Sequence, residues 1–144
     1  MTAFLLVASF ALLSLLHCYW LAGGRKGLAA VLPTWPAAPG SGEAARPAMN
    51  PGPLATLAVA AGLAGIAVAV ALRAGLFGAP IDHWALRWVL YALAAMMFAR
   101  AVGDFRFVGF FKSVRGTPFA RADKLVYSPL CLAFGAGLTE VAGV

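Results

Sequence analysis

Four long apolar runs separated by more polar connectors dominate the pattern of the chain. They cover about residues 3–22, 54–72, 83–103 and 125–144. Each run approaches the roughly 20 residues that a helix needs to cross a hydrocarbon core about 30 Å thick. The second run, LATLAVAAGLAGIAVAVAL, does not alternate polar and apolar residues as the strands of a membrane barrel do. The pattern predicts an all-α, integral membrane four-helix bundle that forms a single domain over residues 1–144.

Composition supports this class of protein. Of the 144 residues, 62% are hydrophobic and only 11% are charged, whereas roughly a quarter are charged in a typical soluble domain. The first connector, residues 23–53, is rich in Gly, Pro and Ala. We expect it to be irregular, above all from Ala37 to Asn50. We expect the third connector, residues 104–124, to lie at the membrane interface.

Basic residues are distributed unevenly among the connectors. If the helices alternate in direction, the first and third connectors share one side of the membrane, and the second connector carries Arg73 alone. The positive-inside rule then places the first and third connectors in the cytoplasm and both termini outside. The basic residues of those two connectors are Arg25, Lys26, Arg46, Arg106, Lys112, Arg115, Arg121 and Lys124.

Aromatic and basic residues interleave in the third connector, in the sequence FRFVGFFK from Phe105 to Lys112. In a soluble protein this composition would suggest stacking on single-stranded nucleic acid. Next to a membrane span, it favours a segment whose rings enter the acyl boundary while its cations meet anionic headgroups. The expected partners are therefore membrane lipids with anionic headgroups, and not nucleic acid.

Two arginines lie within the third predicted helix, where a charge costs about 2.5–3.5 kcal/mol unless it reaches the surface or an acid. Arg87 is at a depth where it could meet Glu140, and Arg100 has Asp104 four residues on, on the same helical face. We predict both as structural ion pairs, and Asp82 as the cap of this helix. No carboxylate lies in the middle of any span, which disfavours a proton-coupled transporter.

Further contacts can be expected from small and polar residues. Gly62 and Gly65 in the second helix are predicted to let neighbouring helices approach closely. Ser128 and Pro129 suit the first turn of the last helix, where a missing N–H costs nothing. Asp123 is expected to offset one of three cations, namely Arg100, Arg121 or Lys124.

Three segments resemble recurring motifs of the DUF3995 family of short, four-pass bacterial membrane proteins. They are HCYW at residues 17–20 with the GG that follows, GDFRFVGFFK at residues 103–112, and YSPLC at residues 127–131. The resemblance spans essentially the whole chain. It implies a four-helix protein of the bacterial cytoplasmic (inner) membrane, and the family offers no established activity or catalytic residue to carry over.

Several polar residues fall at or near the cytoplasmic ends of the predicted helices. They could line one pocket, with cations for a phosphate or carboxylate headgroup and apolar walls for a tail, or they could only tie the third connector to the bundle. For His17, which is one of them, two interpretations remain open. It could make a structural hydrogen bond to a neighbouring segment, or it could bind a ligand or handle a proton. The ligand-binding candidates are His17, Tyr19, Arg100, Asp104, Arg106, Asp123 and Tyr127.

The two cysteines suggest a redox alternative. Cys18 and Cys131 each lie roughly 6 Å inside the same boundary at about 1.5 Å per residue, so a thiol pair could form. Against it, the spacing is not Cys-x-x-Cys and the cytoplasmic side is reducing. We predict no cofactor. We also predict no metal site, because the only other histidine, His83, falls on the opposite membrane face from His17.

The sequence therefore favours a non-enzymatic membrane module that acts through the polar cluster at the cytoplasmic ends of its helices. This module would bind a lipid-like amphiphile or a partner membrane protein, and the chain could also form a homo-oligomer. The alternative is a small membrane enzyme acting on a lipid or quinone, or the thiol redox protein described above.

Overall fold

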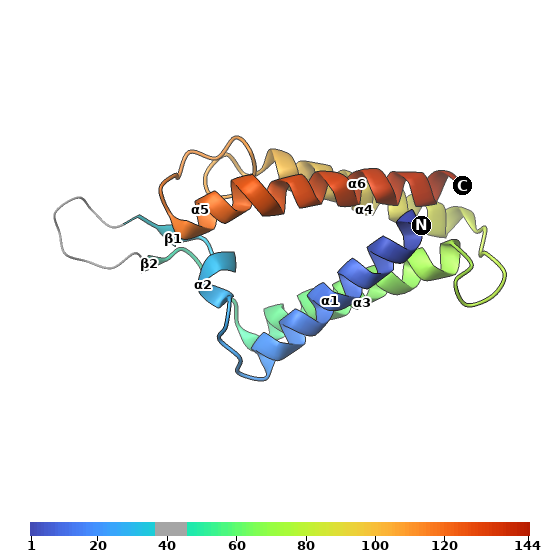
Figure 1. The fold of residues 1–144 in the computed structure, drawn as a ribbon, viewed down its shortest axis with the longest axis horizontal. Helices are drawn as coiled ribbons and strands as arrows, with labels where there is room; N and C mark the ends of the chain where they lie inside the picture. Colours follow the sequence, from blue (N-terminus) through green and yellow to red (C-terminus); the bar gives the residue numbers. More distant parts are fainter. Residues whose placement is uncertain (37–45) are drawn as a thin grey trace. The chain divides into compact units, whose positions relative to one another are not determined.

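The computed structural model describes residues 1–36 and 46–144 (Figure 1). Most of the stretch from Ala37 to Asn50, predicted to be irregular, therefore lies outside the described residues. In chain order the elements are α1 (Thr2–Leu21), α2 (Leu28–Val31), β1 (Thr34–Trp35), β2 (Arg46–Pro47), α3 (Pro53–Arg73), α4 (Trp84–Val102), α5 (Pro118–Ala122), the π-helical turn η1 (Asp123–Tyr127) and α6 (Ser128–Gly143).

In the described part of the chain, four helices are long and apolar enough to cross a membrane, namely α1, α3, α4 and the continuous helix Pro118–Gly143 formed by α5, η1 and α6. The all-α membrane architecture is thereby confirmed. The last span starts at Pro118 and not near residue 125. Thr117 caps it by accepting a hydrogen bond from the Ala120 N–H at 3.0 Å. Pro118 takes the first helical position, where its missing N–H is not needed.

The chain divides into two units, and α4 and the last span contribute residues to both. The bundle unit comprises Met1–Gly24, Gly52–Met97 and Ala133–Val144. The connector unit comprises Arg25–Pro51 and Phe98–Leu132.

Apolar side chains from all four spans form the core of the bundle unit. The rings of Phe10 in α1 and Phe134 in α6 have centroids 4.7 Å apart. Because lipid tails are as apolar as these side chains, close packing rather than transfer from water holds the helices together. The core residues are Leu6, Phe10, Ile66, Ala67, Val70, Leu90, Ala94, Phe134, Leu138, Val141 and Ala142.

Neighbouring helices of the bundle unit run in opposite directions. Ser14 Oγ in the second half of α1 donates a hydrogen bond of 2.8 Å to the Ala60 carbonyl in the first half of α3. Figure 1 shows α1 and α3 side by side and antiparallel. The contacts between α1 and α6 follow the same rule, since Phe10 faces Phe134 and the earlier Leu6 faces the later Gly137.

The close approach between helices occurs at Gly137 and not at the glycines predicted for it. A Cβ at Gly137 would lie 3.2 Å from the side chain of Leu6 and 3.3 Å from that of Thr2. A Cβ at Gly62 or Gly65 would meet nothing within 4 Å among the described residues. The prediction for these two α3 residues is therefore wrong within this chain, because a glycine aids packing only where a neighbour lies over it.

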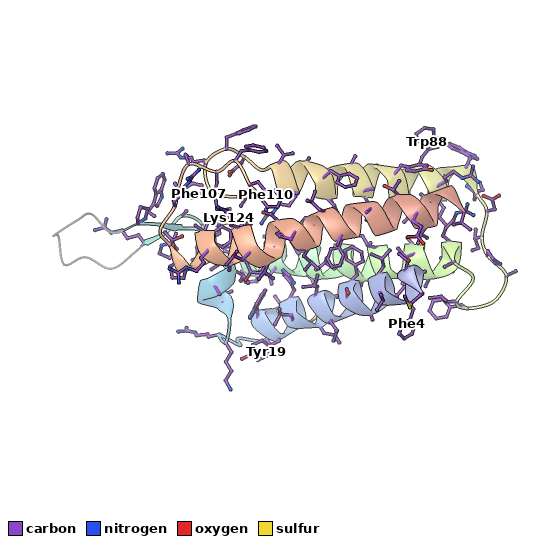
Figure 2. All side chains as sticks on the ribbon, turned by 45° about the horizontal axis from the view of Figure 1, so that its top comes forward. Phe4, Tyr19, Trp88, Phe107, Phe110 and Lys124 are labelled. Carbon is purple, nitrogen blue, oxygen red and sulfur yellow. The ribbon has the colours of Figure 1, made fainter. Side chains whose placement is uncertain are left out.

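Large apolar side chains cover the outside of the bundle unit. Phe4 and Trp88 are each 66% exposed, and Figure 2 shows both pointing away from the helices. Extensive exposed apolar surface of this kind marks contact with a membrane or a partner. Together with the four apolar helices, it identifies a multi-pass membrane protein.

Asp82 binds two arginines in the turn between α3 and α4. Its Oδ1 accepts a hydrogen bond of 2.9 Å from Arg87 Nη2 and lies 3.1 Å from Nη1 of the buried Arg73. Arg87 is therefore paired with Asp82. The pair with Glu140 that was predicted from the sequence is wrong. An acid five residues away in the adjoining turn reaches Arg87 without any contribution from α6.

His83 takes the capping role that was predicted for Asp82. Its Nδ1 accepts a hydrogen bond of 3.2 Å from the Ala85 N–H at the start of α4. The Asp82 carboxylate is held by Arg73 and Arg87. Because Asp82 is engaged in this way, its neighbour His83 accepts the hydrogen bond from the Ala85 N–H at the start of the helix.

The first and third connectors pack against each other in the connector unit. Strands β1 and β2 pair antiparallel, with Trp35 opposite Arg46, so the described part of the first connector is not irregular throughout. The ring of Trp35 has its centroid 4.7 Å from that of Phe107. Segments in direct contact cannot lie on opposite faces of a bilayer, so these two connectors share one side, as alternating helices require.

Candidate functional site

Most of the positive charge of the protein is gathered in one unit. Nine of the eleven basic residues belong to the connector unit. The structure describes two acidic residues in this unit, Asp104 and Asp123. The two carboxylates have different environments, and each organises a different part of the unit.

Asp123 lies in η1 and has no exposed surface. Its Oδ1 accepts a hydrogen bond of 2.8 Å from Arg100 Nη2. Its Oδ2 accepts hydrogen bonds of 2.8 Å from Lys112 Nζ and from the Gly109 N–H, and lies 3.4 Å from Ser128 Oγ. A buried carboxylate with two cations and a backbone donor around it remains charged without an unpaired ion in the interior.

This network corrects the ion pair predicted between Arg100 and Asp104. The i, i+4 rule needs both residues on one helix, but α4 ends at Val102. Asp104 therefore lies beyond the helix, and Arg100 turns to Asp123, one of the pairings that the sequence had left open. The second cation of the network, Lys112, was not anticipated.

Asp104 stabilises the turn that follows α4. Its Oδ1 accepts hydrogen bonds from the backbone N–H groups of Arg106, Phe107 and Val108 at 2.9, 2.7 and 2.9 Å. Partial burial by itself raises the pKa of Asp104, but these three donors outweigh it and hold the pKa below its ordinary value of 3.8. The Asp104 carboxylate thus stabilises the turn by accepting hydrogen bonds from its backbone.

Two glycines close the same turn. A Cβ on Gly103 would overlap the Val108 carbonyl, and a Cβ on Gly109 would overlap the Val102 carbonyl. Both glycines also have positive φ, at 100° and 87°, which favours glycine over other residues. The glycines and the aspartate of GDFRFVG are therefore explained by the geometry of one tight turn.

Arg106 and Tyr127 both contact the first connector. The Arg106 Cζ lies 4.8 Å from the centroid of the Trp35 ring, in cation–π geometry. The Tyr127 hydroxyl donates a hydrogen bond of 3.3 Å to the Ala30 carbonyl in α2. These contacts bind residues 25–36 to the third connector and the start of the last span.

The remaining candidates, His17 and Tyr19, belong to the bundle unit. His17 Nδ1 donates a hydrogen bond of 2.8 Å to the Leu13 carbonyl one turn earlier in α1, because a carbonyl oxygen can only accept. The ring of Tyr19 covers Gly24 so closely that a Cβ there would overlap it. The second glycine of the GG that follows HCYW is thus needed, because a side chain at that position would overlap the tyrosine ring.

A hollow of about 230 Å³ in the connector unit has a basic lining, and none of the described residues that line it is acidic. Lys112 belongs both to this lining and to the Asp123 network. Phe110 and Lys124, labelled in Figure 2, come from the third connector and from η1. The lining residues that bear on binding are Phe110, Lys112, Arg115, Thr117, Arg121 and Lys124.

From the sequence, the cations of this hollow were assigned to topology, to headgroup contact and to pairing with Asp123, but not to one shared site. A signal for the hollow was nevertheless present. Arg121 and Lys124 are three residues apart, which places them on one helical face, and the Thr117–Pro118 start shows that both lie within the helix. This shared face is lost when the last helix is predicted to start near residue 125, because Arg121 and Lys124 then fall in a connector.

Comparison with protein families matches residues 10–138 to the family described as "Protein of unknown function (DUF3995)". The match covers most of the chain and includes all three motif segments named above. Comparisons with curated proteins and with solved structures return no match.

Proposed function

Because the chain belongs to the DUF3995 family of proteins of unknown function, we propose a function from the geometry of its connector unit. The protein is a non-enzymatic membrane module that binds a lipid-like amphiphile with an anionic headgroup. Binding takes place through the connector unit at the cytoplasmic surface of the bacterial inner membrane. The observation that carries this proposal is the concentration of nine of the eleven basic residues in that unit.

Exposed aromatic side chains accompany these cations. Phe105 and Phe111 are 63% and 65% exposed, respectively. Rings enter the boundary between headgroups and acyl chains, while each basic residue near an anionic surface contributes about 1 kcal/mol of attraction. A unit that presents both is suited to the inner leaflet, where anionic lipids face the cytoplasm.

The polar candidates from the sequence support this surface from within. Asp123 holds Arg100 and Lys112, and Asp104 holds the turn after α4. Arg106 stacks on Trp35. In the proposed module these residues give the connector unit its shape, and its exposed cations contact the lipid.

Lipid analysis of the protein in native membrane discs tests the proposal. The protein is extracted with its surrounding lipids, and mass spectrometry compares them with the bulk membrane. We expect anionic lipids to be enriched around the natural protein and less enriched around the double variant Arg25→Gln/Lys26→Gln. Arg87→Gln, which removes one positive charge from the bundle unit, is the control and should keep the enrichment. Equal lipid composition for the natural protein and the bulk membrane would refute the module.

The other readings from the sequence stay predictions. A partner membrane protein or a second copy of the chain would be recovered reproducibly by crosslinking in the membrane. An enzyme acting on a lipid or quinone would form product in a manner sensitive to His17→Ala. A redox role would need Cys18 and Cys131, which are free thiols in α1 and α6.

A further inference from the structure

We propose that the basic hollow of the connector unit binds one phosphate monoester group, the headgroup of an amphiphile such as a phosphatidic-acid-like lipid. This inference deepens the proposed function and rests on it for the lipid as the source of the phosphate. The hollow measures about 230 Å³, below the roughly 300–1,000 Å³ of pockets that enclose drug-sized ligands. It therefore suits a headgroup whose tail remains outside.

The charges around the hollow favour a phosphate with two negative charges. Lys112 is already paired with Asp123. In the part of the chain that the structure describes, no acidic side chain pairs with Arg115, Arg121 or Lys124. Three like charges around one hollow repel each other. A phosphate monoester carries a charge of about −1.5 to −2 near pH 7 and relieves this repulsion more than a diester with a single charge.

The frame of the hollow is held by hydrogen bonds that need no ligand. Lys112 Nζ donates hydrogen bonds of 2.8 Å to the Gly109 carbonyl and to the buried carboxylate of Asp123. Thr117 caps the helix that contains Arg121. Arg121 and Lys124 then project from one face of that helix. Donors that are already positioned lower the entropy cost of binding an anion.

The donor types also fit phosphate. A guanidinium group presents paired N–H donors that match two phosphate oxygens, and an ammonium group adds a compact positive charge. Arg115 and Arg121 supply the guanidinium groups, and Lys124 supplies an ammonium group at the same hollow. The lining thus combines both kinds of phosphate contact.

One apolar side chain of the lining, and exposed apolar residues adjacent to the lining in sequence, offer a surface for an acyl chain. Phe110 lines the hollow itself, and Figure 2 labels it together with Lys124. Phe111 and Leu125, their neighbours in the chain, are 65% and 68% exposed. A phosphomonoester lipid uses both the cations and this apolar surface, whereas free phosphate uses the cations alone.

The test is a titration of the full-length protein in neutral detergent with three probes. Native mass spectrometry follows phosphatidic acid and phosphatidylglycerol, and calorimetry follows inorganic phosphate. We expect one phosphatidic acid per chain, bound about tenfold more tightly than phosphatidylglycerol. Arg121→Gln should weaken this binding about tenfold or more, because a hydrogen bond to a charged group is lost. Arg87→Gln is the matched control and should leave it unchanged.

Thermal unfolding in the same detergent checks that Arg121→Gln remains folded, and Lys124→Gln provides an independent second variant. Inorganic phosphate that binds in an Arg121-dependent way without a lipid tail would support the phosphate site and identify free phosphate as its source. Equal binding of phosphatidic acid by Arg121→Gln, Lys124→Gln and Arg87→Gln would overturn the site, as would equal affinity for phosphatidylglycerol.

Failure of the site and failure of the module can be told apart. If anionic lipids remain enriched around the protein while the Arg121 and Lys124 variants bind phosphatidic acid normally, the phosphate site is wrong and the proposed function survives. If no anionic lipid is enriched around the natural protein in native discs, the proposed function fails as well.

Discussion

Lys112 Nζ lies 2.8 Å from Asp123 Oδ2, and both side chains are buried, with 5% and 0% of their surface exposed. The two residues come from segments that the sequence gives no reason to pair, a connector and the start of the last span. Their contact joins the GDFRFVGFFK and YSPLC segments, because Gly109 and Ser128 approach the same carboxylate oxygen.

Asp123→Asn is expected to destabilise the protein by about 3–5 kcal/mol, since it leaves Arg100 and Lys112 without their buried counter-charge. Unfolding in detergent micelles with increasing denaturant measures the loss. Glu140→Gln, which changes an exposed carboxylate, serves as the control and should stay within about 0.5 kcal/mol of the natural protein. Adding Lys112→Met to Asp123→Asn should cost less than the two single losses together, because the residues interact. Strict additivity would show that the pair is not coupled.

Asp104→Ala is expected to destabilise the turn after α4 in a pH-dependent way. The folded-state pKa of Asp104 lies below its ordinary value of 3.8. Its carboxylate therefore contributes stability that is fully present above that value and is lost as the pH falls through the lower, folded-state pKa. The difference in unfolding free energy between the natural protein and Asp104→Ala should be largest near neutral pH and shrink below about pH 3.8.

Asp104→Asn controls for the shape of the side chain. Its amide oxygen can still accept backbone hydrogen bonds but carries no charge. This variant should therefore lie between Asp104→Ala and the natural protein at neutral pH, and its stability should lack the acid-sensitive contribution. A natural protein whose advantage over Asp104→Ala does not change with pH would contradict this role.

Gly137→Leu is expected to destabilise the bundle unit by about 1–3 kcal/mol, because α6 passes too close to Leu6 and Thr2 for a larger side chain. Gly62→Leu is the matched substitution in α3, where a Cβ meets nothing within 4 Å in this chain. Resistance to unfolding by a harsh detergent ranks the two variants. If Gly62→Leu proves the more damaging, α3 packs against something other than the described residues of one chain.

The orientation of the spans can be tested with single cysteines in a background where Cys18 and Cys131 are replaced by alanine. Asn50→Cys reports on the first connector and Ala79→Cys on the second. With the first connector in the cytoplasm, a membrane-impermeant maleimide should label Ala79→Cys in intact spheroplasts. It should label Asn50→Cys only after permeabilisation, and the reverse pattern would invert the topology.

Much of the fold follows from local sequence. The four spans, their alternation and the shared side of the first and third connectors follow from apolar length and from charge distribution, because lipid tolerates few alternatives to a helix. The start of the last span at Pro118 was also encoded locally, by the threonine and proline that begin it, but the stronger apolar signal after residue 125 concealed it.

Polar partnerships were harder to predict, because side chains that are distant in sequence meet through the turns between elements. Arg100 was assigned to Asp104 on helical spacing, but the helix ends first and Asp123 takes its place. Arg87 was assigned to Glu140 on depth, but it pairs with Asp82 in the adjoining turn.

The sequence by itself determined that lipid surrounds the spans, that there are four of them and that two connectors share one side of the membrane, because these properties depend on summed hydrophobicity and charge. Only the tertiary structure decided which cations are neutralised and which remain available. That choice depends on where one buried carboxylate, Asp123, sits: it pairs with Arg100 and Lys112 and leaves Arg115, Arg121 and Lys124 around a hollow. Such a difference arises from ångström-scale distances, which spacing along a chain does not specify.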